Sequence, residues 1–482
     1  MAEDILQKSK DRLKSDQEYW SDNYKKSKDD ARFLSDDTFA QWDEADYNER
    51  TSSGRPAITV DQLSQFVHQV VNDIRINTPT INVIPSGLES DTETADALKG
   101  IIKSIEYASN ADNAYDTAAY NAVKQGIGFI RVIVDYAGEN TFNQELKIAR
   151  VVNPLACWID AASVEIDGRD AMHATILEKM RVSEFNRRYP DKEPSCFEDS
   201  DRECKDDDFI SIAEQFVIEE TEKTIGISDD GTVFDIVEGK KAKAKRTRVV
   251  KTRKVIHRKM SGKDILEETV FPGKYIPIIP VYGEENWIEG KRNLFSLIRK
   301  SKDAQRMFNY WKSLETELLM KAPLAPVMAA EGTTEDYSAD WINPAKAAVL
   351  RYKTTDADGN PATPPVRLPP PPIPTGLVNA SRGSVDDIKA TMGLYNASIG
   401  AKSNETSGVA ISQRKQEGDV ATYHFADNLS KSITQVGRVL VGAIPEAYDA
   451  AQILLIIGQE DEPKKIGING EIAEGQDNTI DL

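Results

Sequence analysis

The spacing of apolar residues predicts amphipathic helices along much of the chain. Within residues 63–74 the apolar positions fall at i, i+3, i+4, i+7, i+8 and i+11, which places them on one stripe of an α-helix. Looser helical spacing of Leu6, Leu13 and Trp20 among dense charges favours an amphipathic helix and connector over residues 3–50. Further helical patterns cover residues 93–124, about 376–393 and 408–448.

Extended segments alternate with these helices. Ile81, Val83 and Pro85 have the period of a short strand. Two β-rich runs at 129–136 and 146–152 flank a polar Gly138-Glu139-Asn140 turn and predict a hairpin. Helix-like pieces and strands then alternate from about 165 to 280.

Two more extended segments complete this pattern. The run at 275–280 contains prolines that permit only an edge strand or an irregular one. Two apolar runs within 452–469 predict a second hairpin. Helices mixed with mostly antiparallel strands predict the α+β class.

The second half of the chain contains one long uninterrupted segment. Residues 291–321 lack Pro and Gly and carry apolar residues at helical spacing, which predicts a helix of about 45 Å. The following segment, 322–372, has little helical periodicity and ends in prolines that favour extended geometry, so we expect a small inserted module. A polar loop is expected at 394–407.

Length and charge narrow the class of protein. A chain of 482 residues is too long for a single core and predicts at least two substructures. The 79 acidic residues outnumber the 60 basic ones, and the resulting net charge of −19 disfavours a protein that clamps DNA. No apolar run approaches the roughly 20 residues of a membrane span, and the N-terminus lacks a secretory signal pattern. Three cysteines cannot all pair within one chain, so a reducing cytoplasm fits best.

A search for catalytic and cofactor motifs finds none that is convincing. The sequence contains no phosphate loop, and Gly126-Ile127-Gly128 lacks the third glycine of a dinucleotide-binding turn. Cys196 and Cys204 are too widely spaced for a zinc knuckle, and the four histidines are scattered. We therefore predict no enzyme, no cofactor and no metal site.

Three charged segments are better explained as solvated structure. The acidic residues at 199–208 are interpreted as a solvated loop, and Asp356-Ala357-Asp358-Gly359 as a turn rather than a calcium loop. The run from Lys240 to Lys259 holds eleven Lys or Arg residues. If that run is a strand, its charges divide between both faces, so a solvated strand is favoured over a nucleic-acid contact.

Several ordered segments resemble the portal proteins of short-tailed phages of the P22-like family. They are RPAITVDQLSQFVHQVVNDIRINTPTINVIP at 55–85, YIPIIPVYGE at 275–284, DAQRMFNYWKSLETE at 303–317, AAEG at 329–332 and GLYNASIGAKSNETSGVAISQRKQEGDVATYHFADNLSKSI at 393–433. Their order along the chain carries the resemblance, since no single motif decides it.

The resemblance implies a ring-forming portal fold, with an α/β wing, long stem helices and a small clip. In this sequence it implies a wing at 1–290, a first stem helix at 291–321, a clip at 322–372, a second stem helix at 373–393, a channel-facing loop at 394–407, a long helix back to the wing at 408–448 and a terminal hairpin and tail at 449–482. Family members usually continue into a crown, so we expect either that the crown is absent here or that the sequence is truncated before it.

The function implied is that of a head–tail connector in the virion, at one capsid vertex, made in the host cytoplasm. The implied partners are eleven further copies in a twelve-membered ring, the terminase large subunit, the head-to-tail adaptor and tail proteins, scaffolding and major capsid proteins, and double-stranded DNA passing without sequence recognition. No membrane is involved. Lys402 and Asn404 are the expected channel residues, and Tyr310, Trp311, Leu314 and Leu318 the expected subunit interface.

Two other functions compete with this one. Another structural head or connector protein would share the composition and the lack of catalytic motifs, and only the ordered segments argue against it. A nucleic-acid packaging enzyme such as terminase is less favoured, because the sequence lacks the phosphate loop and acidic motifs that such an enzyme needs.

Overall fold

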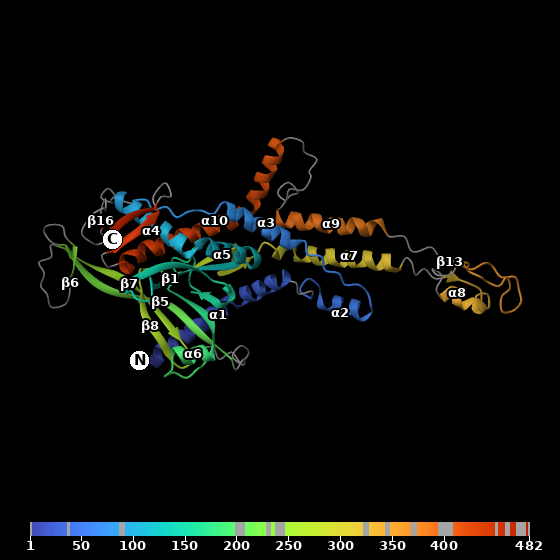
Figure 1. The fold of residues 1–482 in the computed structure, drawn as a ribbon, viewed down its shortest axis with the longest axis horizontal. Helices are drawn as coiled ribbons and strands as arrows, with labels where there is room; N and C mark the ends of the chain where they lie inside the picture. Colours follow the sequence, from blue (N-terminus) through green and yellow to red (C-terminus); the bar gives the residue numbers. More distant parts are fainter. Residues whose placement is uncertain are drawn as a thin grey trace. The chain divides into compact units, whose positions relative to one another are not determined.

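A computed structural model describes residues 2–35, 39–85, 92–197, 208–227, 233–236, 246–321, 327–342, 348–367, 374–393, 408–448, 452–457, 463–468 and 479–480. The fold is mixed α+β, as predicted, with 47% helix and 25% strand. The chain divides into two compact units (Figure 1). Unit 1 comprises residues 1–32, 64–300 and 392–482, and unit 2 comprises residues 33–63 and 301–391.

A six-stranded sheet forms one half of unit 1. Its strands are β3 (Cys157–Ile159), β4 (His173–Arg181), β5 (Phe209–Ile227), β6 (Val233–Ile236), β7 (Arg246–Met260) and β8 (Ile265–Phe271). They run in the antiparallel order β3-β4-β5-β7-β8, and β6 pairs with the outer part of β5. The short helix α6 (Val182–Arg188) follows β4.

The N-terminal helix α1 (Ala2–Phe33) covers one face of this sheet (Figure 1). Leu6 and Leu13 pack in one cluster with Ala213 of β5 and Met260 of β7. Trp20 is 1% exposed, and its indole Nε1 donates to the Ile159 carbonyl at 2.9 Å. Since β3 is an edge strand, helix α1 also satisfies a carbonyl that would otherwise lack a partner.

A three-stranded sheet forms the other half of unit 1. Its strand order is β2 (Gln144–Arg150), β1 (Ile127–Tyr136), β9 (Ile278–Tyr282). Helices α4 (Thr92–Ser109), α5 (Ala111–Gln125) and α10 (Gly408–Ala447) contact its strands. The predicted hairpin is confirmed as β1–β2, and the proline-containing run lies at the sheet edge, as expected.

The remaining elements of unit 1 are one helix and two small hairpins. They are α3 (Leu63–Ile76), whose first residue belongs to unit 2, the hairpin β10 (Glu284–Ile288) and β11 (Lys291–Phe295), and the terminal hairpin β14 (Gln452–Ile457) and β15 (Pro463–Ile468), joined by β16 (Thr479–Ile480). The predictions of a helix from Leu63 and of a terminal hairpin are confirmed.

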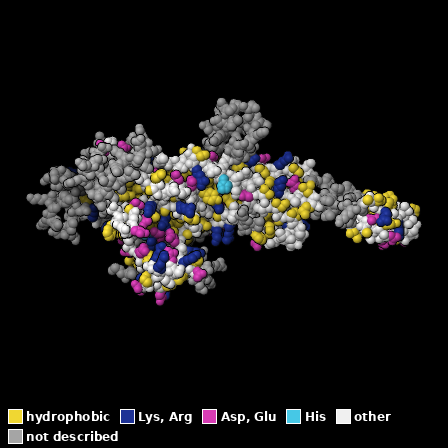
Figure 2. Space-filling view, viewed as in Figure 1, with side chains coloured by type: hydrophobic (Ala, Val, Ile, Leu, Met, Phe, Trp, Pro, Cys, Tyr) yellow, Lys and Arg dark blue, Asp and Glu magenta, His cyan; other side chains and the backbone are white. Residues whose placement is uncertain are grey.

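Unit 2 is built on helices. They are α2 (Glu44–Ser52), α7 (Lys302–Lys321), α8 (Ser338–Ile342) and α9 (Thr375–Met392), and a two-stranded sheet pairs β12 (Val327–Met328) with β13 (Val366–Arg367). Hydrophobic side chains gather on the surface of the small module that carries α8 (Figure 2). Among them, Ile342 is 80% exposed and Val349 71%. The aspartates at 356–358 form a turn, as predicted, because the Asp356 side chain accepts from the Asp358 and Asn360 amides.

The helix predicted at 291–321 was wrong in its first third, because it begins at Lys302. Residues 291–295 form strand β11, which pairs with β10 across a two-residue turn at Glu289 and Gly290, both with positive φ. Such a turn matches the twist of a hairpin and overrides the helical spacing that follows it.

Two other predicted elements also differ in the structure. The helix expected over 93–124 is two helices, α4 and α5, because Asn110 adopts a left-handed conformation (φ 54°) that interrupts helical geometry. The short strand expected at Ile81–Pro85 does not form a strand, and Ile81 is instead buried as part of the core. Of the three alternating apolar residues, only Ile81 is buried, and it packs in the core without pairing with a strand.

Candidate functional site

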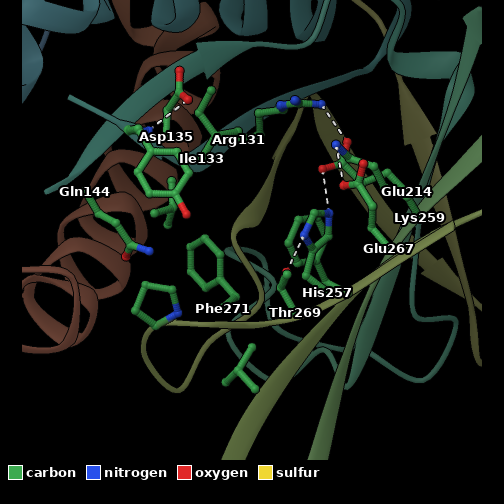
Figure 3. A pocket seen from close by; sticks show the side chains of 15 residues that line it. Arg131, Ile133, Asp135, Gln144, Glu214, His257, Lys259, Glu267, Thr269 and Phe271 are labelled. Atoms are coloured by element: carbon green, nitrogen blue, oxygen red, sulfur yellow. Dashed lines mark hydrogen bonds and ion pairs between the residues drawn. The ribbon is translucent and has the colours of Figure 1, made fainter. Parts of the chain in front are cut away.

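A cavity of about 510 Å³ lies between β1 and the face of the six-stranded sheet that is not covered by α1. We call it the sheet cavity (Figure 3). The strand register places Glu214 opposite Lys259, Phe216 opposite His257, and His257 opposite Thr269. These side chains therefore point to one face, and Arg131 of β1 reaches the same space from the other sheet.

Glu214 is the centre of a hydrogen-bonded network in the sheet cavity. One carboxylate oxygen binds His257 Nε2 at 2.9 Å, and the other accepts from Arg131 at 3.2 Å. The same guanidinium also binds Glu178 at 2.8 Å. Burial by itself would raise the pKa of Glu214, but the His257 hydrogen bond and the Arg131 charge outweigh it, so the pKa lies below its ordinary value.

His257 is held on three sides. Its ring stacks on Phe216 with centroids 4.5 Å apart, and Nδ1 lies 3.2 Å from the Thr269 hydroxyl. A hydroxyl, imidazole and carboxylate in series have the connectivity of a catalytic triad. Here the carboxylate also neutralises Arg131, and Lys259 pairs with Glu267 at 3.2 Å. The arrangement therefore balances charge and ties the two sheets together.

A second cluster joins Asp16 of α1, Asp160 and His173. Its ligand atoms lie within 4.8 Å of one another, and no other such group that could hold a metal occurs in the described ranges. His173 Nε2 lies 2.9 Å from Asp16, and its Nδ1 faces Asp160 at 3.8 Å. The carboxylates also accept backbone amides: Asp16 accepts from Ala161, and Asp160 accepts from Ala162 with one oxygen and from Met172 with the oxygen that faces His173. Because all four oxygens are used, the cluster fastens α1 to the sheet.

The cysteines offer no thiolate to a metal in the described part of the chain. Cys157 is buried in β3, and burial raises the pKa of its thiol well above the ordinary value, which keeps it protonated. Cys196 is disulfide-bonded. Cys204 lies outside the described residues.

Asp16 belongs to a polar row on α1 that the sequence analysis missed. Asp16, Asn23 and Asp30, here called the α1 ladder, recur every seven residues and are buried. Asn23 donates to the Arg292 carbonyl at 2.8 Å and accepts from the Leu294 amide at 3.0 Å. Asp30 accepts from Ser296 and Arg299. The seven-residue spacing, which matches that of Leu6, Leu13 and Trp20, was the available signal.

Helix α7 also buries a polar row, here called the α7 ladder. Gln305, Asn309, Ser313 and Glu317 make up the α7 ladder, and all four are buried. Gln305, Asn309 and Ser313 accept the backbone amides of Gln62, Val60 and Ile58 at 3.1, 3.0 and 2.8 Å, respectively. The extended segment 56–62 thus pairs with side chains of a helix instead of with another strand.

Glu317 completes the α7 ladder with an ion pair. Its carboxylate binds Arg50 at 3.1 Å, with both side chains nearly buried. Arg50 also donates to the Pro56 carbonyl at 3.0 Å and lies over the Tyr310 ring at 5.4 Å. A buried charge of this kind is stable only while its partner is present.

The predicted interface residues lie mostly on the other side of α7. Met307, Trp311, Leu314 and Leu318, here called the α7 stripe, are centred about 150° around the helix from the α7 ladder at 100° per residue. Met307 is 46% exposed and the other three are half-buried. Tyr310 is half-buried between the two rows and meets Trp311 edge to face. Helix α7 therefore turns its polar side inward.

The basic run forms strand β7 from Arg246 onward, with charges on both faces, whereas its first residues, 240–245, lie outside the described residues. The sequence analysis did not identify the acidic partners. Arg258 is buried between Glu219 and Glu268, and Glu220 binds Lys251 and Arg253. Figure 2 shows Lys and Arg interspersed with Asp and Glu over this sheet. Together with Lys259, which pairs with Glu267, four of the seven Lys and Arg residues of β7 thus have carboxylate partners within the sheet.

Two predictions concern residues that the structure does not describe. Lys402 and Asn404, the expected channel residues, and the acidic segment 199–207 lie outside the described residues. No helix in the described ranges is both long enough and apolar enough to cross a bilayer.

Comparison with known proteins gives a match to a family and matches to curated relatives. A family model described as phage P22-like portal protein matches residues 10–481. A curated portal protein of Acyrthosiphon pisum secondary endosymbiont phage 1 is 21% identical over 437 residues. The match covers 84% of the chain but only 60% of that relative's own length.

Proposed function

Because the chain belongs to the phage P22-like portal protein family, a structural and non-catalytic family of the virion, we propose that it assembles into a closed ring of twelve copies around a DNA channel. The ring would sit at one capsid vertex, where the genome is packaged, retained and ejected. The observation that carries the proposal is the orientation of α7, whose α7 ladder is buried and whose α7 stripe is left partly exposed.

The α7 stripe has the geometry of a contact between copies. Residues at i, i+4, i+7 and i+11 form one continuous apolar row, which packs well against a neighbouring helix. Large apolar side chains left partly exposed on a helix whose buried polar side chains have partners favour an interaction site. In a closed ring every copy would use the same two surfaces, so the number of copies is set by the angle between them.

We extend the proposal to the parts of the chain. Residues 1–290 would form the wing, 302–321 and 373–393 the stem helices, 322–372 the clip and 408–448 the helix returning to the wing. The exposed apolar side chains near α8 support a clip that meets partners, namely the terminase large subunit during packaging and the head-to-tail adaptor afterwards. Scaffolding and major capsid proteins would contact the outer surface.

The net charge supports a channel that does not grip its cargo. Each contact between lysine and phosphate adds affinity that must be lost before DNA moves on. A wall built from chains of charge −19 would keep such contacts few. We propose that the few transient contacts with DNA are made by Lys402 and Asn404 in the loop 394–407. If a Lys402→Glu particle packages and retains DNA as before, that loop does not line the channel.

Negative-stain electron microscopy of the purified chain tests the ring directly, because top views should show a closed ring with a central hole. A matched pair of variants tests the α7 stripe. The double substitution Leu314→Gln/Leu318→Gln should abolish rings, because it places two amides in the proposed contact. Leu319→Gln, next in sequence but 53% exposed and on another side of the helix, should leave rings intact.

The results distinguish an error about the ring from an error about the contact that forms it. A chain that remains monomeric at all concentrations contradicts the ring and favours another structural head protein. Rings that persist with the doubly substituted α7 stripe leave the ring standing but exclude α7 as its contact. Circular dichroism of each variant shows whether the fold is kept.

A further inference from the structure

A second cavity of unit 1 differs from the sheet cavity in its charge. It has a volume of about 900 Å³ and lies between one side of α1, the strands β3 and β4, and the beginning of β5. Three lysines line it, Lys25 and Lys28 from α1 and Lys179 from β4, and no Asp or Glu is among its described lining residues. We call this cavity the lysine groove.

The three lysines of the lysine groove make no ion pair or hydrogen bond within the described residues. In the sheet cavity, by contrast, Arg131, His257 and Lys259 each have a carboxylate partner. In a chain of net charge −19, three lysines that have no carboxylate partner among the described residues favour a local positive potential in this cavity, whose described lining contains no Asp or Glu. That potential is complementary to an anionic ligand.

The floor of the lysine groove is apolar. Trp158 and Leu177 line it and also pack on the core cluster that contains Leu6 and Leu13. Tyr24 lies beside Trp158, with ring centroids 5.9 Å apart, and Leu155 extends the apolar surface. Since these side chains are held by α1 and the sheet, the lysine groove is formed before any ligand arrives.

We propose that the lysine groove binds an acidic polypeptide segment with interspersed apolar side chains, carried by a partner protein. The lysines pair with its carboxylates, and its apolar side chains cover Trp158, Leu155 and Leu177. The volume lies within the range of about 300 to 1,000 Å³ typical of ligand sites. The proposal does not depend on ring formation.

Nucleic acid fits this surface less well. A duplex presents phosphates and sugars, which have nothing to place against an apolar floor, and its length exposes it to the negative charge of the rest of the chain. A single strand could stack a base on Trp158, but Tyr24 already lies beside that ring. A short acidic segment meets only the local positive potential.

Fluorescence anisotropy with the full chain tests the proposal with three labelled probes. They are a Glu-Glu-Leu repeat peptide, a Glu-Glu-Ser repeat peptide of equal length, and a single-stranded DNA of equal charge. The Glu-Glu-Leu peptide should bind most tightly, with the Glu-Glu-Ser peptide about fivefold weaker because it lacks apolar contact. Tighter binding of the DNA than of either peptide would overturn the proposal in favour of a nucleic-acid site.

A matched pair of variants locates the binding. Lys25→Gln/Lys28→Gln should weaken the Glu-Glu-Leu peptide about tenfold, because two charge partners are lost. Lys14→Gln/Lys26→Gln removes the same charge from other exposed positions of α1 and should change the affinity less than about twofold. Equal losses in both pairs would show a general charge effect and contradict the lysine groove.

A single substitution on another element keeps the test independent of helix α1. Lys179→Gln, on β4, should weaken the same peptide by about threefold, with unchanged circular dichroism. If either α1 variant fails to fold, the affinity of Lys179→Gln for the Glu-Glu-Leu peptide tests the proposal by itself. Unchanged affinity in Lys179→Gln would overturn the proposal.

Discussion

Helices α1 and α7 both bury a polar row, but they do so in different ways. In α1, the α1 ladder alternates with Leu6, Leu13 and Trp20, so polar and apolar contacts share the buried side, and most of the other charged residues are exposed. In α7, the α7 ladder takes the buried side almost alone, and the α7 stripe lies on another side. Each ladder satisfies backbone groups distant in the sequence.

The difference shows that apolar spacing does not by itself identify the inward face of a helix. Helix α1 is covered by its own chain, because its large apolar residues Leu6, Leu13, Trp20 and Phe33 are buried. The buried polar side chains of helix α7 have hydrogen-bond partners, whereas the apolar side chains of the α7 stripe are only partly covered. If the proposed ring forms, this difference separates a helix that stabilises one subunit, α1, from a helix that joins subunits, α7.

The largest expected effect is that of Trp20→Ala in α1. It should lower the free energy of unfolding of the unassembled chain by about 3 to 5 kcal/mol, because a fully buried indole leaves a cavity and the Ile159 carbonyl loses its donor. Urea denaturation followed by circular dichroism measures it. A cost below about 1 kcal/mol would mean that α1 is not integral to unit 1.

The next effect concerns the ion pair of the α7 ladder. Arg50→Met should cost about 3 kcal/mol in the free energy of unfolding, because the Glu317 carboxylate stays buried without its main cation. The double variant Arg50→Met/Glu317→Leu should recover most of that loss, since no charge then remains buried. Failure of the double variant to recover would show that Arg50 acts through the Pro56 carbonyl or Tyr310 instead.

Two asparagines allow the ladders to be compared directly. Asn23→Ala in α1 and Asn309→Ala in α7 should each cost about 1 to 3 kcal/mol, because each leaves a backbone amide without its acceptor. Hydrogen exchange should increase locally, at Leu294 for the first and at Val60 for the second. A much smaller cost for Asn309→Ala would show that the segment 56–62 has other partners.

Trp311→Ala in the α7 stripe is the counterpart of Trp20→Ala. It should lower the free energy of unfolding of the unassembled chain by only about 1 kcal/mol, since the side chain is half-buried. Ring formation, followed by light scattering, should nevertheless fall strongly. A stability loss as large as that of Trp20→Ala would place Trp311 in the core of its own subunit.

Acidification should have the smallest effect on stability. The effect should be local and should be small near neutral pH. Glu214 and Glu267 have pKa values below the ordinary 4.5, so their ionised forms stabilise the folded state above that pH, and the contribution is lost as pH falls through the lowered values. Hydrogen exchange, corrected for its intrinsic pH dependence, should rise in β5 and β7 below about pH 4.5. The amides paired with Asn309 and Ser313 should be unaffected, because those side chains do not titrate.

The sequence alone determined the α+β class, helix α3, the hairpins β1–β2 and β14–β15, and the resemblance to portal proteins that the family match confirms. These features depend on local periodicity and on ordered segments, which one chain displays without its partners. The break at Asn110 and the hairpin at Glu289-Gly290 were missed, because a single left-handed residue or a two-residue turn can end a periodic pattern.

Only the tertiary structure decided which polar residues are buried and what they bind. Ser313 meets Ile58 across 255 positions of sequence, and Asn23 meets Leu294 across 271. Lys25 and Lys179 line one cavity although they lie on different elements. Periodicity describes which residues share a face, whereas the partner of that face comes from distant chain segments and is set by packing. For this reason the inward face of α7 and the charge of the lysine groove could not be predicted from the sequence.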